Sequence, residues 1–251
     1  MGIKNTLNKY LRRIGVELHG INYLKALSKG DFKSSEIDVI KRFYRDSKIV
    51  IYDVGANRGL MIEEYLKHFP LCNIHAFEAY PQYAETLNLQ YEKFENVTIN
   101  KFGISNTEDQ LALNVNKSID TSSFLSSQKT GLNSDSQVQT ETIVRVPVTT
   151  LETYSKSNNH EKIHLLKLDI QGSELNALKG AEILLRENRI DFIFCETYFI
   201  QQYLMQPSFF DISNYLLSFG YVLQDIYNPI YGHGKMAWCD VLFVNKNLTL
   251  H

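Results

Sequence analysis

Two carboxylates and a glycine-containing turn are spaced as in a nucleoside-binding site. The segment Asp53-Val-Gly-Ala-Asn-Arg-Gly59 follows an apolar stretch, and its glycines allow the backbone to turn sharply and to approach a ligand closely. Glu78 follows Gly59 by 19 positions. An acid about 20 residues beyond such a turn can accept hydrogen bonds from both hydroxyls of a ribose. We therefore predict a nucleoside site whose ligand-binding residues are Asp53, Gly55, Asn57, Gly59 and Glu78.

The first residue of the turn indicates which nucleoside is bound. Dinucleotide-binding turns prefer glycine at the position of Asp53, because a carboxylate there repels pyrophosphate. The same carboxylate attracts the ammonium group of an amino acid. S-adenosylmethionine joins an adenosine ribose to an amino acid through a sulfonium, so it is the expected cofactor. A dinucleotide-binding, sugar-modifying oxidoreductase and a non-catalytic adenosyl-binding protein are the alternatives.

A second predicted strand-to-helix junction carries further acids. Its sequence is Lys167-Leu-Asp-Ile-Gln-Gly-Ser-Glu174. Asp169 falls at the carboxyl end of the strand, the edge at which open α/β sheets bind ligands. If this strand is a neighbour of the strand that leads into Asp53, the two aspartates lie side by side.

Strands alternate with helices along the segment that carries these motifs. The apolar runs predict strands at 49–52, 73–78, 97–104, 163–170 and 191–196, a one-faced strand near 111–115, and two late strands at about 221–227 and 237–245. Helices are predicted at 60–69, 81–91 and 209–219, and from Ser173, as the N-cap, to about 185. The alternation predicts one α/β domain at 49–251, built on a mostly parallel sheet.

Two segments fall outside this alternation. Residues 1–48 are basic, with apolar residues at intervals of three or four, and are expected to form an N-terminal helical extension. Residues 117–142 contain 11 Ser or Thr and no Pro, which predicts a long polar loop. The loop is either a surface insertion or a flap over the site.

Four motifs in order give the chain a resemblance to a known family. They are Asp53-Val-Gly-Ala-Asn-x-Gly59, Phe77-Glu78-x-x-Pro81, Val148-Thr-Thr-Leu151 and Leu166-Lys-Leu-Asp-Ile-Gln-Gly-Ser-Glu-Leu-x-x-Leu-Lys-Gly180. On these motifs, which span about residues 50–200, the chain resembles the FkbM-type methyltransferases. Two positions differ from the family's usual pattern. Ala79 replaces a frequent proline, and Gln171 replaces a frequent glutamate, which argues against an acid role at position 171.

The resemblance implies a class I methyltransferase fold, Rossmann-like, with a mostly parallel seven-stranded sheet that is flanked by helices and ends in an antiparallel strand. It also implies S-adenosylmethionine as the donor and O-methylation of a sugar, a glycan or a secondary metabolite. By the same resemblance, Asp53, Gly55 and Gly59 hold the methionine end, and Glu78 with its neighbour Ala79 holds the ribose. The adenine is bordered by Gly103, Ile104 and Ser105.

Methyl transfer to a hydroxyl needs a group that removes the hydroxyl proton. Asp169 is the first candidate because of its position, Glu174 is the second, and His233, in a loop with two glycines, is the third. Glu196 ends an apolar strand and, with Tyr198, is a candidate for acceptor binding. A hard cation such as Mg²⁺ would suit a hydroxyl substrate, but no motif demands a metal.

Composition and charge narrow the functional class. The 251 residues are 44% hydrophobic and 22% charged, with a net charge of −2, which excludes a chain disordered throughout and gives no general attraction to nucleic acid. Three cysteines fit neither a disulfide framework nor a zinc motif, so a reducing, cytoplasmic location is expected. No membrane-spanning helix and no signal peptide are predicted. The expected partner is a small-molecule or glycan acceptor.

Overall fold

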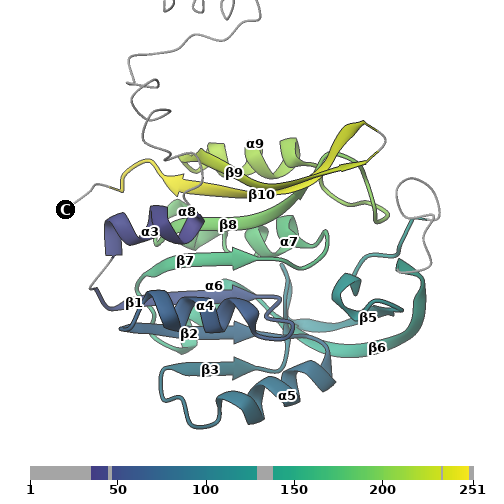
Figure 1. Ribbon diagram of the computed structural model, residues 1–251, viewed down its shortest axis with the longest axis horizontal. Helices are drawn as coiled ribbons and strands as arrows, with labels where there is room; N and C mark the ends of the chain where they lie inside the picture. Colours follow the sequence, from purple (N-terminus) through teal and green to yellow (C-terminus); the bar gives the residue numbers. More distant parts are fainter. Residues whose placement is uncertain (1–34, 45–46, 129–137, 233, 249–251) are drawn as a thin grey trace, which may run out of the picture. The chain divides into compact units, whose positions relative to one another are not determined.

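The computed structural model describes residues 35–44, 47–128, 138–232 and 234–248. Its main sheet consists of β1 (Ile49–Val54), β2 (Cys72–Phe77), β3 (Val97–Asn100), β7 (Ile163–Leu168), β8 (Ile190–Tyr198), β9 (Tyr221–Gly232) and β10 (Lys235–Asn245). Their order across the sheet is β3-β2-β1-β7-β8-β10-β9 (Figure 1). The first five pair in parallel, whereas β10 runs antiparallel to both β8 and β9. The strand order reverses between β1 and β7, which is where open α/β sheets place a ligand crevice.

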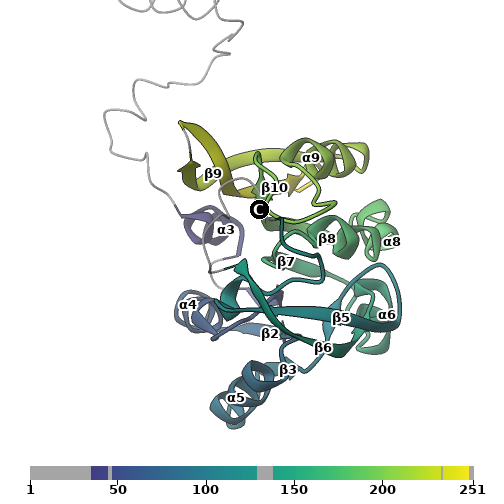
Figure 2. The same cartoon turned by 90° about the vertical axis from the view of Figure 1, so that its right-hand side faces the viewer.

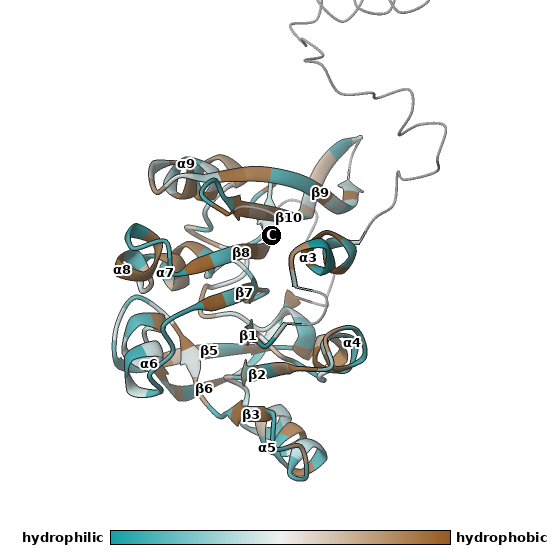
Figure 3. Cartoon of the chain, turned by 90° about the vertical axis from the view of Figure 1, so that its left-hand side faces the viewer, coloured by the Kyte–Doolittle hydropathy of each residue, from teal (hydrophilic) through white to brown (hydrophobic). Residues whose placement is uncertain are grey.

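Helices cover both faces of this sheet. One layer contains α3 (Glu36–Tyr44), α4 (Leu60–His68) and α5 (Pro81–Tyr91), and the opposite layer contains α6 (Leu151–Ser157), α7 (Glu174–Lys179), α8 (Glu182–Arg186) and α9 (Phe209–Ser218) (Figure 2). Successive strand residues point to opposite faces, so Ile51 packs in the first layer and Tyr52 in the second. Hydropathy colouring shows apolar stretches on the central strands and mixed colours on the helices (Figure 3).

Local sequence signals account for several helix ends. Pro81 occupies the first turn of α5, as predicted, because its fixed φ suits a helix start. Ser208 and Asp211 form a capping box that begins α9, which ends before Gly220 as predicted. The predicted strands and helices are confirmed in type and order with the exceptions below, whereas α6 was not predicted.

The strand predicted at 97–104 was wrong in its second half. β3 ends at Asn100, and the chain then leaves the main sheet to form β4 (Gly103–Ile104). β4 pairs with β6 (Thr140–Thr149), which also pairs with β5 (Asp109–Asn116) to make a second, three-stranded sheet. The apolar run could not reveal this change, because the partner of β4 comes from a distant segment.

The helix predicted from Ser173 to about 185 is two short helices. Gly180 follows α7 and lies against a backbone carbonyl, so that a Cβ there would be 2.1 Å from the oxygen of Ser105. The backbone at Gly180 therefore lies so close to Ser105 that only glycine fits there. Ser173 occupies the N-cap of α7 as predicted, but its buried hydroxyl makes no capping hydrogen bond.

The polar segment predicted at 117–142 begins with the 3₁₀ turn η2 (Ile119–Thr121), which lies against β5. Asn114 of β5 and Ser123 exchange backbone hydrogen bonds and hold the next residues beside that strand. Parts of the predicted segments lie outside the described residues. They are residues 129–137 of this polar segment, residues 1–34 of the predicted N-terminal extension, and His233.

Candidate active site

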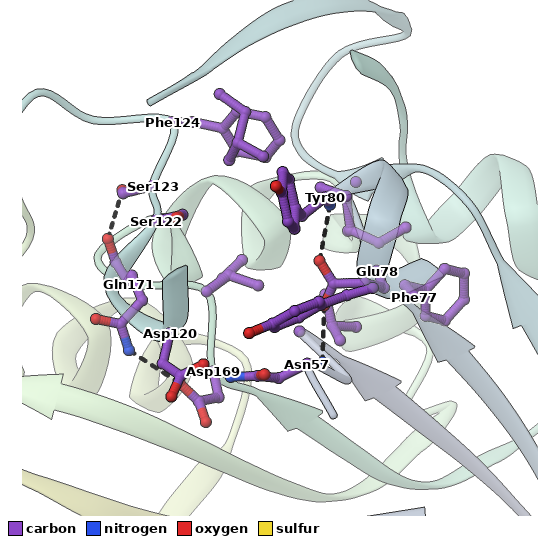
Figure 4. Close-up of a pocket in the computed structure, with 18 of the residues that line it drawn as sticks. Asn57, Phe77, Glu78, Tyr80, Asp120, Ser122, Ser123, Phe124, Asp169 and Gln171 are labelled. Carbon is purple, nitrogen blue, oxygen red and sulfur yellow. Dashed lines mark hydrogen bonds between the residues drawn. The ribbon is translucent and has the colours of Figure 1, made fainter. Parts of the chain in front are cut away.

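A cavity of about 280 Å³ lies over the carboxyl ends of β1, β2, β7 and β8, at the point where the strand order reverses (Figure 4). Its floor comes from the turns that follow these strands, and its roof from β5, η2 and residues 122–124. The volume is close to the lower end of small-ligand pockets, roughly 300–1,000 Å³. The lining residues used below are Gly55, Asn57, Phe77, Glu78, Tyr80, Gly103, Ile104, Asp120, Phe124, Asp169, Gln171 and Glu196.

Glu78 is held rigidly at the end of β2. Its Oε2 accepts a hydrogen bond of 2.7 Å from the backbone N–H of Asn57, and its Oε1 accepts one of 2.7 Å from that of Tyr80 (Figure 4). Burial raises the pKa of Glu78 to about 7, against the lowering effect of these two donors. Each carboxylate oxygen still has a free lone pair. Glu78 is therefore oriented to accept two further hydrogen bonds from a ligand.

The turn after β1 brings the backbone to the cavity wall. Gly55 has φ 81°, and a Cβ at this position would lie 1.9 Å from the backbone oxygen of Asp169. Asn57 also has a left-handed φ of 51°, and its buried Oδ1 has no hydrogen-bond partner. This turn thus offers a ligand an unpaired acceptor beside Glu78.

Asp53 lies behind the cavity wall. Its side chain is fully buried, and Lys167 Nζ lies 3.1 Å from Asp53 Oδ1 in an ion pair. The same ammonium lies 3.5 Å from Asp169 Oδ2 and donates a 2.9 Å hydrogen bond to the carbonyl of Gly55. Burial lowers the pKa of Lys167, but the two carboxylates outweigh that effect and raise the pKa above its usual value. Lys167 is therefore charged and joins β1 to the exposed acid of β7.

Asp169 and Glu196 face the cavity from neighbouring strand ends. The Gln171 Nε2 group lies 3.2 Å from Asp169 Oδ1 and 3.1 Å from Glu196 Oε2. The hydroxyl of Tyr198 donates to Glu196 Oε2. Burial, reinforced by the negative charge of Asp169, raises the pKa of Glu196 well above its ordinary value. This end of the cavity therefore contains two neighbouring carboxyl groups, and burial favours the protonated form of Glu196.

Glu174 supports the turn instead of facing the cavity. Its side chain is buried, and its Oε1 accepts hydrogen bonds from the backbone N–H groups of Ile170 (3.0 Å) and Gly172 (3.2 Å). Burial raises the pKa of Glu174 to about 7. Glu174 therefore stabilises the turn that joins β7 to α7.

The structure brings most of the predicted site residues to one cavity. Those that line it are Gly55, Asn57, Glu78, Ala79, Gly103, Ile104, Asp169 and Glu196. Those that are buried and do not line it are Asp53, Gly59, Ser105, Glu174 and Tyr198. Their binding and catalytic roles stay predictions. His233 cannot be placed, because it is outside the described residues.

Several lining residues were not predicted. The aromatic side chains of Phe77, Tyr80 and Phe124 flank the cavity, and Asp120 and Ser122 enter it from the roof. Tyr80 lies two positions after Glu78, so proximity in sequence could have suggested it. The roof residues carried no such signal, since only the tertiary fold places them over β1 and β2.

Among the described residues, no group of three or more His, Cys, Asp or Glu side chains is placed to hold a metal ion. None of the helices in the described part of the chain has the length and apolar character needed to cross a membrane. Cys72, Cys195 and Cys239 are free, buried thiols.

Comparison with known proteins agrees with the motifs. Residues 53–223 match the family model described as "Methyltransferase FkbM domain". None of the curated proteins compared matches the sequence. Among solved structures, the chain is similar to an rRNA methylase from Streptococcus thermophilus (12% identity, TM-score 0.48, 83% of this chain and 93% of that one). It is also similar to fibrillarin from Aeropyrum pernix, solved with S-adenosyl-L-methionine (12% identity, TM-score 0.43, 87% of this chain and 72% of that one).

The family match and the strand order decide the classification. The order of the seven strands, with β10 antiparallel to its neighbours, confirms the class I methyltransferase fold that the resemblance implied. The matched segment covers more than half of the 251 residues and includes both strand-to-helix junctions of the cavity. The chain belongs to the FkbM methyltransferase family.

Proposed function

We propose that the protein transfers a methyl group from S-adenosylmethionine to a hydroxyl of a sugar, a glycan or a secondary metabolite. The observation that carries this proposal is the pairing, in one cavity, of a nucleoside-binding end with a proton-accepting end. Glu78 and the unpaired Oδ1 of Asn57 belong to the first, and Asp169 and Glu196 to the second. Membership of the FkbM family supports the reaction class.

The residues at the first end fit the cofactor. The free lone pairs of Glu78 suit the two hydroxyls of its ribose, and the Asn57 Oδ1 suits its ammonium group. Gly103 and Ile104, together with Phe77, provide apolar walls for the adenine ring. When bound, S-adenosylmethionine supplies a methyl group that is already activated by the sulfonium.

The residues at the second end provide a base for the attacking hydroxyl and a group that binds the acceptor. Asp169 removes the proton of the attacking hydroxyl, because its side chain is partly exposed to the cavity and Lys167 holds it in place. Glu196, oriented by Tyr198, binds a further hydroxyl of the acceptor. Alignment of the hydroxyl with the methyl group contributes much of the rate, since the donor needs no further activation.

We also propose that the protein is cytoplasmic and acts on acceptors other than nucleic acid. The three free thiols support a reducing compartment. The near-neutral charge of the chain supports the absence of a nucleic-acid partner.

A transfer assay with methyl-labelled S-adenosylmethionine tests this function. The acceptor panel contains free sugars, oligosaccharides, polyketide-type alcohols and, for comparison, amines and RNA, each with and without Mg²⁺. We expect label on a hydroxyl compound, and a loss of about 10²- to 10⁴-fold in Asp169→Asn if this carboxylate is the base. Label on amines alone would contradict O-methylation, and label on RNA alone would contradict the proposed class of acceptor.

A further inference from the structure

Gln171, which replaces the frequent glutamate of the family's motif, makes contacts through both ends of its side-chain amide. Its Nε2 lies within hydrogen-bond distance of Asp169 Oδ1 (3.2 Å) and Glu196 Oε2 (3.1 Å). Its Oε1 lies 2.9 Å from the Tyr203 hydroxyl and 3.5 Å from that of Tyr198. Both donors of the amide thus face carboxylates, and its acceptor faces phenols.

These partners decide which way the amide points. The Asp169 carboxylate is paired with the Lys167 ammonium and only accepts hydrogen bonds, so the nitrogen of the amide must face it. The residue itself has a left-handed φ of 53° and lines the cavity. A glutamate here would place a third carboxylate between the other two.

Gln171 also touches the roof of the cavity. The hydroxyl of Ser123 donates a 2.6 Å hydrogen bond to the backbone carbonyl of Gln171 (Figure 4). The Tyr203 hydroxyl, which faces Oε1, is 2.8 Å from the carbonyl of Thr121. The roof is further held by the bond of 2.8 Å from the N–H of Leu204 to the carbonyl of Ser126. The amide is therefore in contact with both the acid pair and the roof.

We propose that Gln171 is a positioning residue, whose amide bridges Asp169 and Glu196 and fixes both carboxylates, with the roof, at the proton-accepting end of the cavity. The part of this inference that concerns the proton acceptor rests on the proposed function. The bridge itself is a property of the protein without any ligand.

The bridge should make the effect of a charge at position 171 depend on pH. In Gln171→Glu the amide donors are lost, and the new carboxylate faces Asp169 at a distance at which like charges repel. Lowering the pH protonates the carboxylate introduced at position 171 and relieves the repulsion. The other charged and titratable groups around it are Asp53, Lys167, Glu174, Tyr198, Tyr203, Asp240 and, across the cavity, Asp120.

The first test compares thermal unfolding of the full chain with that of Gln171→Glu between pH 5 and pH 8. We expect a decrease in Tm of about 1 °C or less at pH 5 and of about 4–8 °C at pH 8, on a scale of 2–4 °C per kcal/mol for a domain of this size. Gln90→Glu is the matched control, because Gln90 donates to Glu63 on the exposed surface. Its Tm should change by less than about 1 °C at both pH values, because an exposed charge is screened by solvent.

A second variant shows whether the carboxylate of Glu196 is the group involved. Adding Glu196→Gln to Gln171→Glu returns an amide to the pair and should restore at least half of the Tm lost at pH 8. An equal loss at both pH values, or no recovery in the double variant, would overturn the bridge. S-adenosylmethionine binding to the wild type, measured by calorimetry, tests the proposed function separately. Failure of the wild type to bind it would contradict the proposed function and leave the result on the bridge unaffected.

Discussion

The ammonium of Lys167 lies 3.1 Å from the carboxylate of Asp53, where β1 and β7 run side by side. Both side chains are buried, and the same ammonium reaches Asp169 at the cavity. An acid with no access to the cavity still influences it, because it fixes the cation that holds Asp169.

Removing this cation should be costly. In Lys167→Met, Asp53 is left buried without a counter-ion, and we expect a loss of about 3–5 kcal/mol in the free energy of unfolding. Lys101→Met is the control, because its ion pair with Glu85 is exposed and should contribute less than about 1 kcal/mol. Urea unfolding measures both values. Similar losses in the two variants would show that the buried pair has no special importance.

Gly55 should tolerate no side chain. A Cβ in Gly55→Ala would meet the backbone oxygen of Asp169 at 1.9 Å, so the turn must move and S-adenosylmethionine binding should fall by at least about tenfold, or about 1.4 kcal/mol. Gly234→Ala is the matched control, since Gly234 has φ 75° but nothing within 4 Å of the added atom. Calorimetry measures the S-adenosylmethionine affinity of both variants. Backbone strain is present in both, whereas the clash is present only in Gly55→Ala. Unchanged affinity in Gly55→Ala would contradict the described turn.

Stability should fall in acid partly because of His75. Burial, and then the nearby His160, lowers the pKa of His75 to about 4, whereas an exposed histidine has an ordinary value near 6.5. Between these values the unfolded chain binds more protons than the folded one, so stability decreases as the pH falls from about 6.5 to about 4. At about 1.4 kcal/mol per pKa unit, the contribution is about 3 kcal/mol.

The variant His75→Phe isolates this contribution. His75 Nδ1 is 2.8 Å from the Tyr154 hydroxyl, so the variant loses that hydrogen bond at every pH. The difference in unfolding free energy between wild type and variant should therefore be largest at pH 7 and shrink toward pH 4. Glu78 and Glu174, whose raised pKa values act in the opposite direction, are common to both proteins and cancel. A difference that is constant with pH would refute the role of His75.

The sequence predicted the part of the site that is local in the chain. Gly55, Asn57 and Glu78 could be identified because a glycine turn and a strand-end acid follow one another along βα units, and such units place their carboxyl ends at one edge. The same reasoning placed Asp169 beside this turn. It could not show that Asp53 faces away from the cavity, because strand direction alone does not say which of two successive side chains is outermost.

The remaining part depends on contacts between distant segments. Asp120 and Phe124 reach the cavity because β4, β5 and β6 form a second sheet, and no local pattern in the polar segment predicts that sheet. Gln171 was noted only as a departure from the family motif. Its bridging role becomes visible when β7 and β8 bring Asp169 and Glu196 to neighbouring positions.

Titration of S-adenosylmethionine into the wild type, Glu78→Ala and Glu85→Ala by calorimetry tests the central claim most directly. We predict micromolar binding to the wild type, roughly −8 kcal/mol, and to Glu85→Ala, whose carboxylate lies on the exposed side of α5. Loss of two hydrogen bonds to a charged acceptor should weaken binding to Glu78→Ala by about 100-fold. Circular dichroism confirms that each protein is folded. Binding that is absent from the folded wild type, or equal in all three proteins, would contradict the assignment of this cavity to the cofactor, and NAD(P) would be titrated next.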